Sequence, residues 1–210
     1  MLLFRAHIRN KGESVKKTRE PTYSFVILTL LLIVINVILS RLSIVVFPGS
    51  APGVSVIYIA VAFMIITTLW YGAYGAIAAY IGTLVGAGIF ATNPSIPPVV
   101  AIYWSFAGLF QVLIPLAAFR SFDADLALEN RRDWTILFIF GILVNNIVGA
   151  AWGAMTLALG GVIPPADIGS VLFGWLLGNI IVTLIIVPIA LRRLSPRIKK
   201  SKLFVTHYWD

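Results

Sequence analysis

The sequence predicts an all-α integral membrane protein, a polytopic bundle of six transmembrane helices with both termini in the cytoplasm. Three observations support this fold class: 60% of the 210 residues are hydrophobic, only 11% are charged, and the apolar residues form long runs. A soluble domain has about 25% charged residues, so most of this surface is expected to face lipid. At about 20 residues per spanning helix, the chain has room for about six helices and short loops.

The apolar runs divide the chain into three parts. Residues 1–22 are a basic cytoplasmic arm, residues 23–192 the transmembrane domain, and residues 193–210 a basic and aromatic tail expected on the anionic membrane surface. Docking to a partner is the alternative for the tail. Loops that contain Pro, Gly or several charges separate the predicted spans. These spans are 23–40, 54–69, 76–90, 99–119, 134–159 and 170–191.

Basic residues are distributed unevenly over the two ends of the predicted bundle. With six spans, the arm, the turn at 70–75, the loop at 120–133 and the tail share one side, which holds every Lys and Arg except Arg41. Basic loops remain in the cytoplasm, so this side is predicted to be cytoplasmic. We therefore expect a multi-pass protein of the cell membrane. The net charge of +8 reflects this topology and attraction to anionic lipid rather than nucleic-acid binding.

The inventory of reactive residues argues against an enzyme. The chain has no cysteine, and its two histidines, His7 and His207, lie in the polar ends. No Asp, Glu, Lys or His falls in the core of a predicted span, so the membrane contains no nucleophile–base pair, metal cluster or proton relay. We expect no catalytic residues, no metal and no cofactor.

Polar and aromatic residues inside the spans are the candidates for a binding site. Counting from the helix ends places several amides near mid-membrane and several indoles in the extracellular half. The candidate ligand-binding residues are Trp104, Gln111, Asn145, Asn146, Trp152, Trp175 and Asn179. Together they predict an extracellular-side pocket, with amides at its floor and indoles in its walls, for a small neutral or aromatic ligand.

Each of these residue types has an alternative role that contributes only to structure. Amides also join helices through hydrogen bonds, and tryptophans also anchor helices at the membrane interface. Arg41 is a further candidate ligand-binding residue, because it is the basic group at the extracellular end and could pair with a ligand carboxylate. Its alternative role is to extend toward lipid headgroups.

A turn between the second and third spans carries a resemblance to a known family. The six spans, the Pro/Gly loop after the first of them and this turn resemble the substrate-binding S components of energy-coupling-factor (ECF) transporters. The turn reads Tyr71-Gly72-Ala73-Tyr74-Gly75-Ala76 and leads into the small-residue helix AIAAYIGTLVG. The resemblance implies a vitamin-like substrate, a pocket formed by the first loop and spans four to six, and partners that comprise a coupling transmembrane subunit and two ATPases.

The last three spans carry a second resemblance, to membrane-associated sensor domains of the MASE type. It rests on the sixth-span run Gly174-Trp175-Leu176-Leu177-Gly178-Asn179. Two hypotheses follow from these patterns. The first is a small-molecule-binding component of an uptake transporter, energised by partner subunits. The alternative is a ligand-sensing or scaffold domain of a signalling system, with the charged loop at 120–133 as the place where a partner docks.

Overall fold

A computed structural model describes residues 23–90 and 96–209 of the chain. Across these two ranges the regular elements are helices, and the single extended pairing is an isolated bridge between Pro48 and Ser55. The elements are α1 Tyr23–Val46, α2 Ile59–Tyr71, α3 Ala73–Thr83, η1 Leu84–Ile89, α4 Pro98–Trp104, α5 Phe106–Ser121, α6 Arg131–Ile136, η2 Leu137–Val144, α7 Asn145–Leu159, η3 Pro165–Asp167 and α8 Ile168–Ile198. The all-α prediction is confirmed.

Consecutive helical elements join end to end into continuous rods, and four of these rods are long and apolar enough to cross a membrane. They are Tyr23–Val46, Pro98–Ser121, Arg131–Leu159 and Pro165–Ile198, while Ile59–Tyr71 and Ala73–Ile89 are apolar but shorter. The outward sides of α1 and α8 carry exposed large side chains such as Leu30, Val34, Phe173 and Leu184. Such faces are stable against lipid, so the chain is a helical membrane protein.

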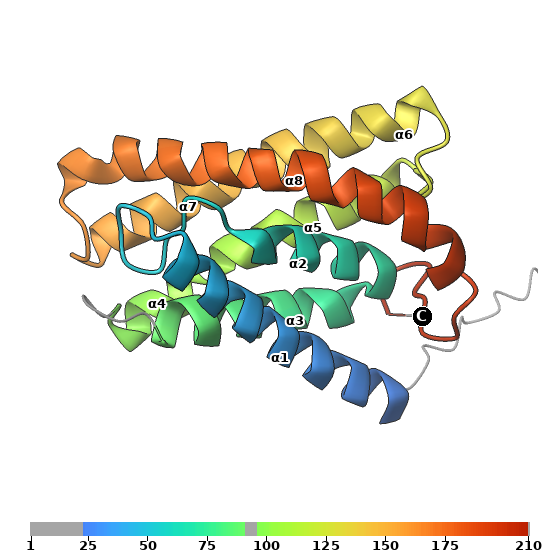
Figure 1. Cartoon of the computed structure of the whole chain (residues 1–210), viewed down its shortest axis with the longest axis horizontal. Coiled ribbons are helices and arrows are strands. Elements are labelled where there is room, and N and C mark those ends of the chain that lie inside the picture. The colour runs from blue at the N-terminus through green and yellow to red at the C-terminus, as the bar shows by residue number, and fades with distance from the viewer. Residues whose placement is uncertain (1–22, 91–95, 210) are drawn as a thin grey trace, which may run out of the picture.

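The rods run along one long axis, and the segments that join them gather at its two ends (Figure 1). One end, here the basic end, holds the start of α1, the loop at 122–130 and the C-terminal segment. The other end, here the loop end, holds the segment 47–58 and the start of α4. The described chain therefore starts and finishes at the same end of the bundle.

Three predicted helix bounds differ from the structure by five or more residues. The first span was expected to end at residue 40, but α1 continues to Val46 and includes Arg41. The second span was expected to begin at residue 54, but α2 begins at Ile59, because residues 47–58 fold into a loop. The sixth was expected to end at 191, but α8 continues to Ile198, with Pro188 and Pro196 inside it. The basic residues at 193–198 that were assigned to the tail therefore belong to this helix.

Small residues and amides set the helix spacing on the α1 side. Asn36 of α1 is completely buried and donates its side-chain amide to the backbone oxygens of Ala78 and Ala79 on α3, both at 3.3 Å. A Cβ at Gly82 would lie only 2.3 Å from that amide nitrogen. Glycine at this position therefore lets the two helices approach closely, as small residues do in membrane bundles.

Candidate ligand-binding site

A small enclosed cavity lies near the loop end, where five parts of the chain meet. Its volume is about 10 Å³, which is room for about one water molecule. The residues that line it come from the 47–58 loop, α3, α4, α5 and α8. They are Gly53, Val54, Ser55, Tyr58, Thr83, Trp104, Gly108, Gln111 and Trp175.

The loop over this cavity is held by hydrogen bonds from one serine. The Ser55 hydroxyl lies 2.8 Å from the backbone oxygens of Ser43 and Phe47 and 3.0 Å from that of Ile57. Two backbone bonds close the loop on itself, from Gly49 N to Val54 O and from Val56 N to Phe47 O. The hydroxyl has one hydrogen, so it donates to one of these three carbonyl groups at a time, and its oxygen also accepts from Ile57 N at 3.3 Å. Residues 54–58 thus take hydrogen-bond partners of a loop in place of those of a helix.

The loop contacts the bundle at two glycines. Gly53 has φ +72°, and a Cβ there would lie 2.8 Å from Ala87 O and 3.2 Å from the Trp104 ring. A Cβ at Gly178 of α8 would lie 1.8 Å from the Val56 carbonyl oxygen. Both contacts place loop backbone directly on a helix, so the cavity is closed in this structure.

Two predicted indoles lie together in the cavity wall. Trp104 of α4 and Trp175 of α8 are buried, with their ring centroids 5.5 Å apart and their planes tilted by 54°. Gly153 of α7 makes room for Trp175, because a Cβ there would lie 2.3 Å from its ring. The Trp104 Nε1–H has no hydrogen-bond acceptor in the described chain.

The third predicted indole, that of Trp152, lies outside this cavity. It is 38% exposed, and its Nε1 donates to the backbone oxygen of Tyr103 at 2.7 Å. Its ring packs edge-on against Phe106 and Phe110. Trp152 instead lines a shallow groove of about 310 Å³ between α4 and α7. This position fits the alternative role of an outward-facing anchor in the membrane.

Three of the predicted amides form one network beside the cavity. Gln111 of α5 donates its Nε2 to Asn146 Oδ1 at 2.8 Å, and Asn146 donates to Thr183 Oγ1 of α8 at 3.1 Å. Asn145 donates to the backbone oxygen of Gln111 at 3.2 Å. Among the three, Gln111 lines the cavity and the two asparagines hold it in place.

Asn179 and Arg41 have separate surroundings, and neither lines the cavity. Asn179 is completely buried on α8, and neither atom of its side-chain amide has a partner in the described chain. Arg41 donates its Nη1 to the Phe90 backbone oxygen at 2.5 Å, at the loop end. The structure thus brings together Trp104, Gln111 and Trp175, supported by Asn145 and Asn146, and leaves Trp152, Asn179 and Arg41 apart from them.

Several lining residues were not predicted. Tyr58 is buried, and its hydroxyl lies 2.7 Å from the Ser40 hydroxyl on α1. Thr83 and Gly108 face one another, since a Cβ at Gly108 would lie 2.8 Å from Thr83 Oγ1. The polar residue inside the small-residue helix at 76–86 was the available signal for Thr83, whereas Tyr58 resembles any other residue at the start of an apolar run.

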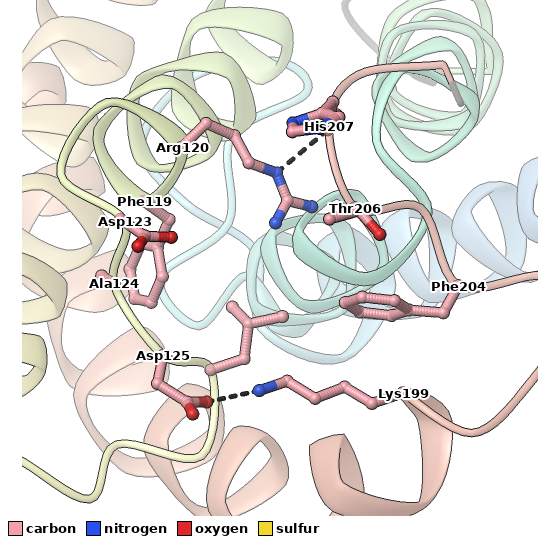
Figure 2. Close-up of a pocket in the computed structure, with 10 residues that line it drawn as sticks. Phe119, Arg120, Asp123, Ala124, Asp125, Lys199, Phe204, Thr206 and His207 are labelled. Carbon is pink, nitrogen blue, oxygen red and sulfur yellow. Dashed lines mark hydrogen bonds and ion pairs between the residues drawn. The ribbon is translucent and has the colours of Figure 1, made fainter.

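A larger, open pocket of about 590 Å³ lies at the basic end, between the end of α5 and the C-terminal segment (Figure 2). Its side chains carry both signs of charge, and most are already paired. Arg120 donates its Nε to His207 O at 2.9 Å and its Nη2 to Leu69 O at 3.1 Å and Val205 O at 2.7 Å. Lys199 Nζ lies 2.5 Å from Asp125 Oδ1, as the dashed line in Figure 2 marks.

The ion pair affects the protonation of Asp125. Partial burial opposes ionisation, but hydrogen bonds from Ala127 N and Lys199 and the positive charge of Lys199 outweigh it, so the pKa of Asp125 lies below its ordinary value. A depressed pKa stabilises the folded state above the unfolded-state pKa, and this contribution is lost as pH falls through the folded-state value. Because both groups are partly exposed, the pair contributes little to stability.

The C-terminal segment packs against the protein after α8. Val205 is fully buried, and its backbone N donates to Trp70 O at 3.0 Å, while Ala73 N donates to Tyr208 O at 2.9 Å. Gly72 has φ +59°, and a Cβ there would lie 2.4 Å from Tyr208 O. The tail predicted to lie on the membrane therefore rests on the α2–α3 turn, and contact of its exposed side chains with lipid stays a prediction.

The chain matches no protein-family model, no curated protein and no solved structure.

Proposed function

We propose that this protein is the membrane-embedded, small-molecule-binding component of an uptake transporter. In this proposal the six rods cross the cell membrane, the basic end faces the cytoplasm, and the loop end faces outward. The single observation that carries it is the cavity under the 47–58 loop. There an amide that is held in place and two buried indoles from three different helices meet beneath a closed cover.

Ligand entry requires the loop to move. The closed cavity holds about one water molecule, so a small molecule has room only when residues 53–55 leave the Trp104 ring. The hydrogen bonds of Ser55 and the contact of Val56 with Gly178 are the interactions that must break. This agrees with the pocket that the resemblance to S components implies, formed from the first loop and the later spans.

The energy for transport comes from elsewhere in this proposal. Among the described residues that line the cavity there is no carboxylate, histidine, lysine or arginine to serve proton coupling. A coupling transmembrane subunit and ATPases, as in ECF transporters, would supply the energy. The basic end, with its charged loop at 120–133, is the surface available to such partners.

A sensor or scaffold is the second candidate function. The open pocket of about 590 Å³ at the basic end favours it, because a signalling partner could dock there. Both functions begin with binding of a ligand, but only a transporter component then moves that ligand into the cell. A transporter component accumulates its ligand in cells that also produce the coupling subunits, whereas a sensor does not.

The direct test is a search for the ligand. The full chain, purified in mild detergent, is analysed by mass spectrometry for metabolites that co-purify, and its melting temperature is measured across a panel of vitamins. We expect one compound to co-purify and to raise the melting temperature in a dose-dependent way. A chain that is empty in every preparation and has the same melting temperature with every compound would contradict the proposal.

A further inference from the structure

The first relevant group is an unused hydrogen-bond donor in the cavity wall. Trp104 is 2% exposed, lines the cavity, and has no acceptor for its Nε1–H in the described chain. Buried donors are almost always satisfied in folded proteins, and an exception in a cavity indicates the place of a water or a ligand acceptor. An occupant that carries an acceptor would satisfy this donor.

The second group is an unused acceptor, and the amide network fixes which atom it is. Asn146 Nδ2 donates to Ile142 O at 2.8 Å and to Thr183 Oγ1, whose own hydrogen goes to Asn179 O at 2.7 Å. Both hydrogens of the Asn146 amide are then used, so its Oδ1 must accept, and it faces Gln111 Nε2. The opposite orientation of Asn146 would place its oxygen against Ile142 O.

In this orientation the side-chain oxygen of Gln111, Oε1, is the acceptor of the network that remains unused. No hydrogen bond in the described chain reaches Gln111 Oε1, while Asn145 holds the backbone of the same residue. Gln111 lies seven residues after Trp104, so the two backbone positions are about 10 Å apart along a helix. The cavity lining thus includes one residue with an unused donor, on α4, and one with an unused acceptor, on α5.

The remaining lining carries no formal charge. Tyr58 is the ionisable side chain among the described residues that line the cavity, and the Tyr58 hydroxyl is already bonded to Ser40. Arg41, the basic residue at the same end, is bonded to Phe90 O and does not line the cavity. A charged ligand would lose its hydration here without gaining a partner, which is strongly unfavourable in a buried site.

We infer that the ligand of this cavity is an uncharged molecule that carries both a hydrogen-bond acceptor and a hydrogen-bond donor. The acceptor takes the Trp104 Nε1–H, and the donor binds Gln111 Oε1. This inference rests on the proposed function, because it names the chemical class of the molecule that the same cavity binds.

The experiment uses N-acetyltyramine as the probe, with an amide acceptor at one end and a phenol donor at the other. Its O-methyl ether lacks the phenol donor, and tyramine replaces the neutral amide with an ammonium group. Binding to the full chain is measured by microscale thermophoresis. We expect the O-methyl ether to bind about tenfold more weakly, as one lost hydrogen bond predicts, and tyramine not to bind.

Two tryptophan variants form the matched pair. Trp104→Phe removes a donor that has no partner in the protein together with part of a buried ring that packs on Trp175, so its melting temperature should fall and N-acetyltyramine should bind about tenfold more weakly. Trp152→Phe removes the bond to Tyr103 O outside the cavity, so its melting temperature should fall while affinity is unchanged. Because both variants are destabilised, loss of affinity in Trp104→Phe alone assigns the effect to the cavity wall, whereas destabilisation by itself would weaken binding in both.

The outcomes separate this inference from the proposed function. The inference is overturned if N-acetyltyramine does not bind or if tyramine binds. It is also overturned if Trp104→Phe binds N-acetyltyramine as tightly as the unmodified chain does. If a charged metabolite nevertheless co-purifies and stabilises the chain, the proposed function stands without it. If no compound binds in either experiment, both are overturned.

Discussion

Buried amides in this bundle fall into paired and unpaired groups. Asn146 takes part in three hydrogen bonds, two of which join α7 to α5 and α8, so it acts as a helix-joining residue. Asn179 is equally buried, but neither polar atom of its amide has a partner in the described chain. An unsatisfied buried polar group costs about 1–3 kcal/mol, so the amide of Asn179 does not stabilise the empty protein.

The same substitution at these two asparagines should have different effects. Asn146→Leu breaks three hydrogen bonds and should lower the free energy of unfolding by about 1–3 kcal/mol. Asn179→Leu removes an unpaired amide and should cause no loss. The free energies are compared by unfolding in sodium dodecyl sulfate. Equal destabilisation by both variants would show that the Asn179 amide has a polar partner.

The loop over the cavity is an element with several contacts to the helices, one of which can be tested in isolation. Ala51, Val54 and Tyr58 are buried in the apolar core, and the Val56 carbonyl rests directly on Gly178 of α8. Gly174 lies one turn earlier on the same helix, and a Cβ there would meet nothing within 4 Å. The two glycines therefore form a matched pair for testing how the cavity is closed.

Gly178→Ala should displace the loop, whereas Gly174→Ala should not. The added methyl group of the first variant would lie 1.8 Å from Val56 O, which forces the loop away from α8. Hydrogen exchange of the 47–58 peptide measures this, because Gly49 N and Val56 N are hydrogen-bonded in the closed loop. We expect faster exchange at these amides in Gly178→Ala alone. Unchanged protection in that variant would mean that another contact holds the loop.

Composition and apolar runs predict most of the architecture, because lipid exposure imposes helices of a set length. The start of α2 could not be predicted, since Val54 and Tyr58 are apolar and the loop depends on the contacts of Ser55 with distant carbonyls. Three of the candidate site residues, Trp104, Gln111 and Trp175, line one cavity, as their predicted depth suggested, and their role in binding stays a prediction. Trp152 is adjacent to the inward Gly153, but the helical turn of about 100° per residue places its ring on the outer side.

At the scale of the whole molecule, every proposed role depends on the loop end and the basic end lying on opposite sides of the membrane. The chain contains no cysteine, so single-cysteine variants can be labelled without background. Ser50→Cys lies in the exposed loop over the cavity, and Ser121→Cys and Ser201→Cys lie at the basic end, where both serines are exposed.

The deciding measurement is labelling of these three variants in intact cells with a membrane-impermeant maleimide. We predict that Ser50→Cys reacts in intact cells, and that Ser121→Cys and Ser201→Cys react only after the membrane is permeabilised. Labelling of Ser50→Cys and Ser201→Cys from the same side would contradict the proposed crossing of the membrane, and with it the outward-facing binding cavity.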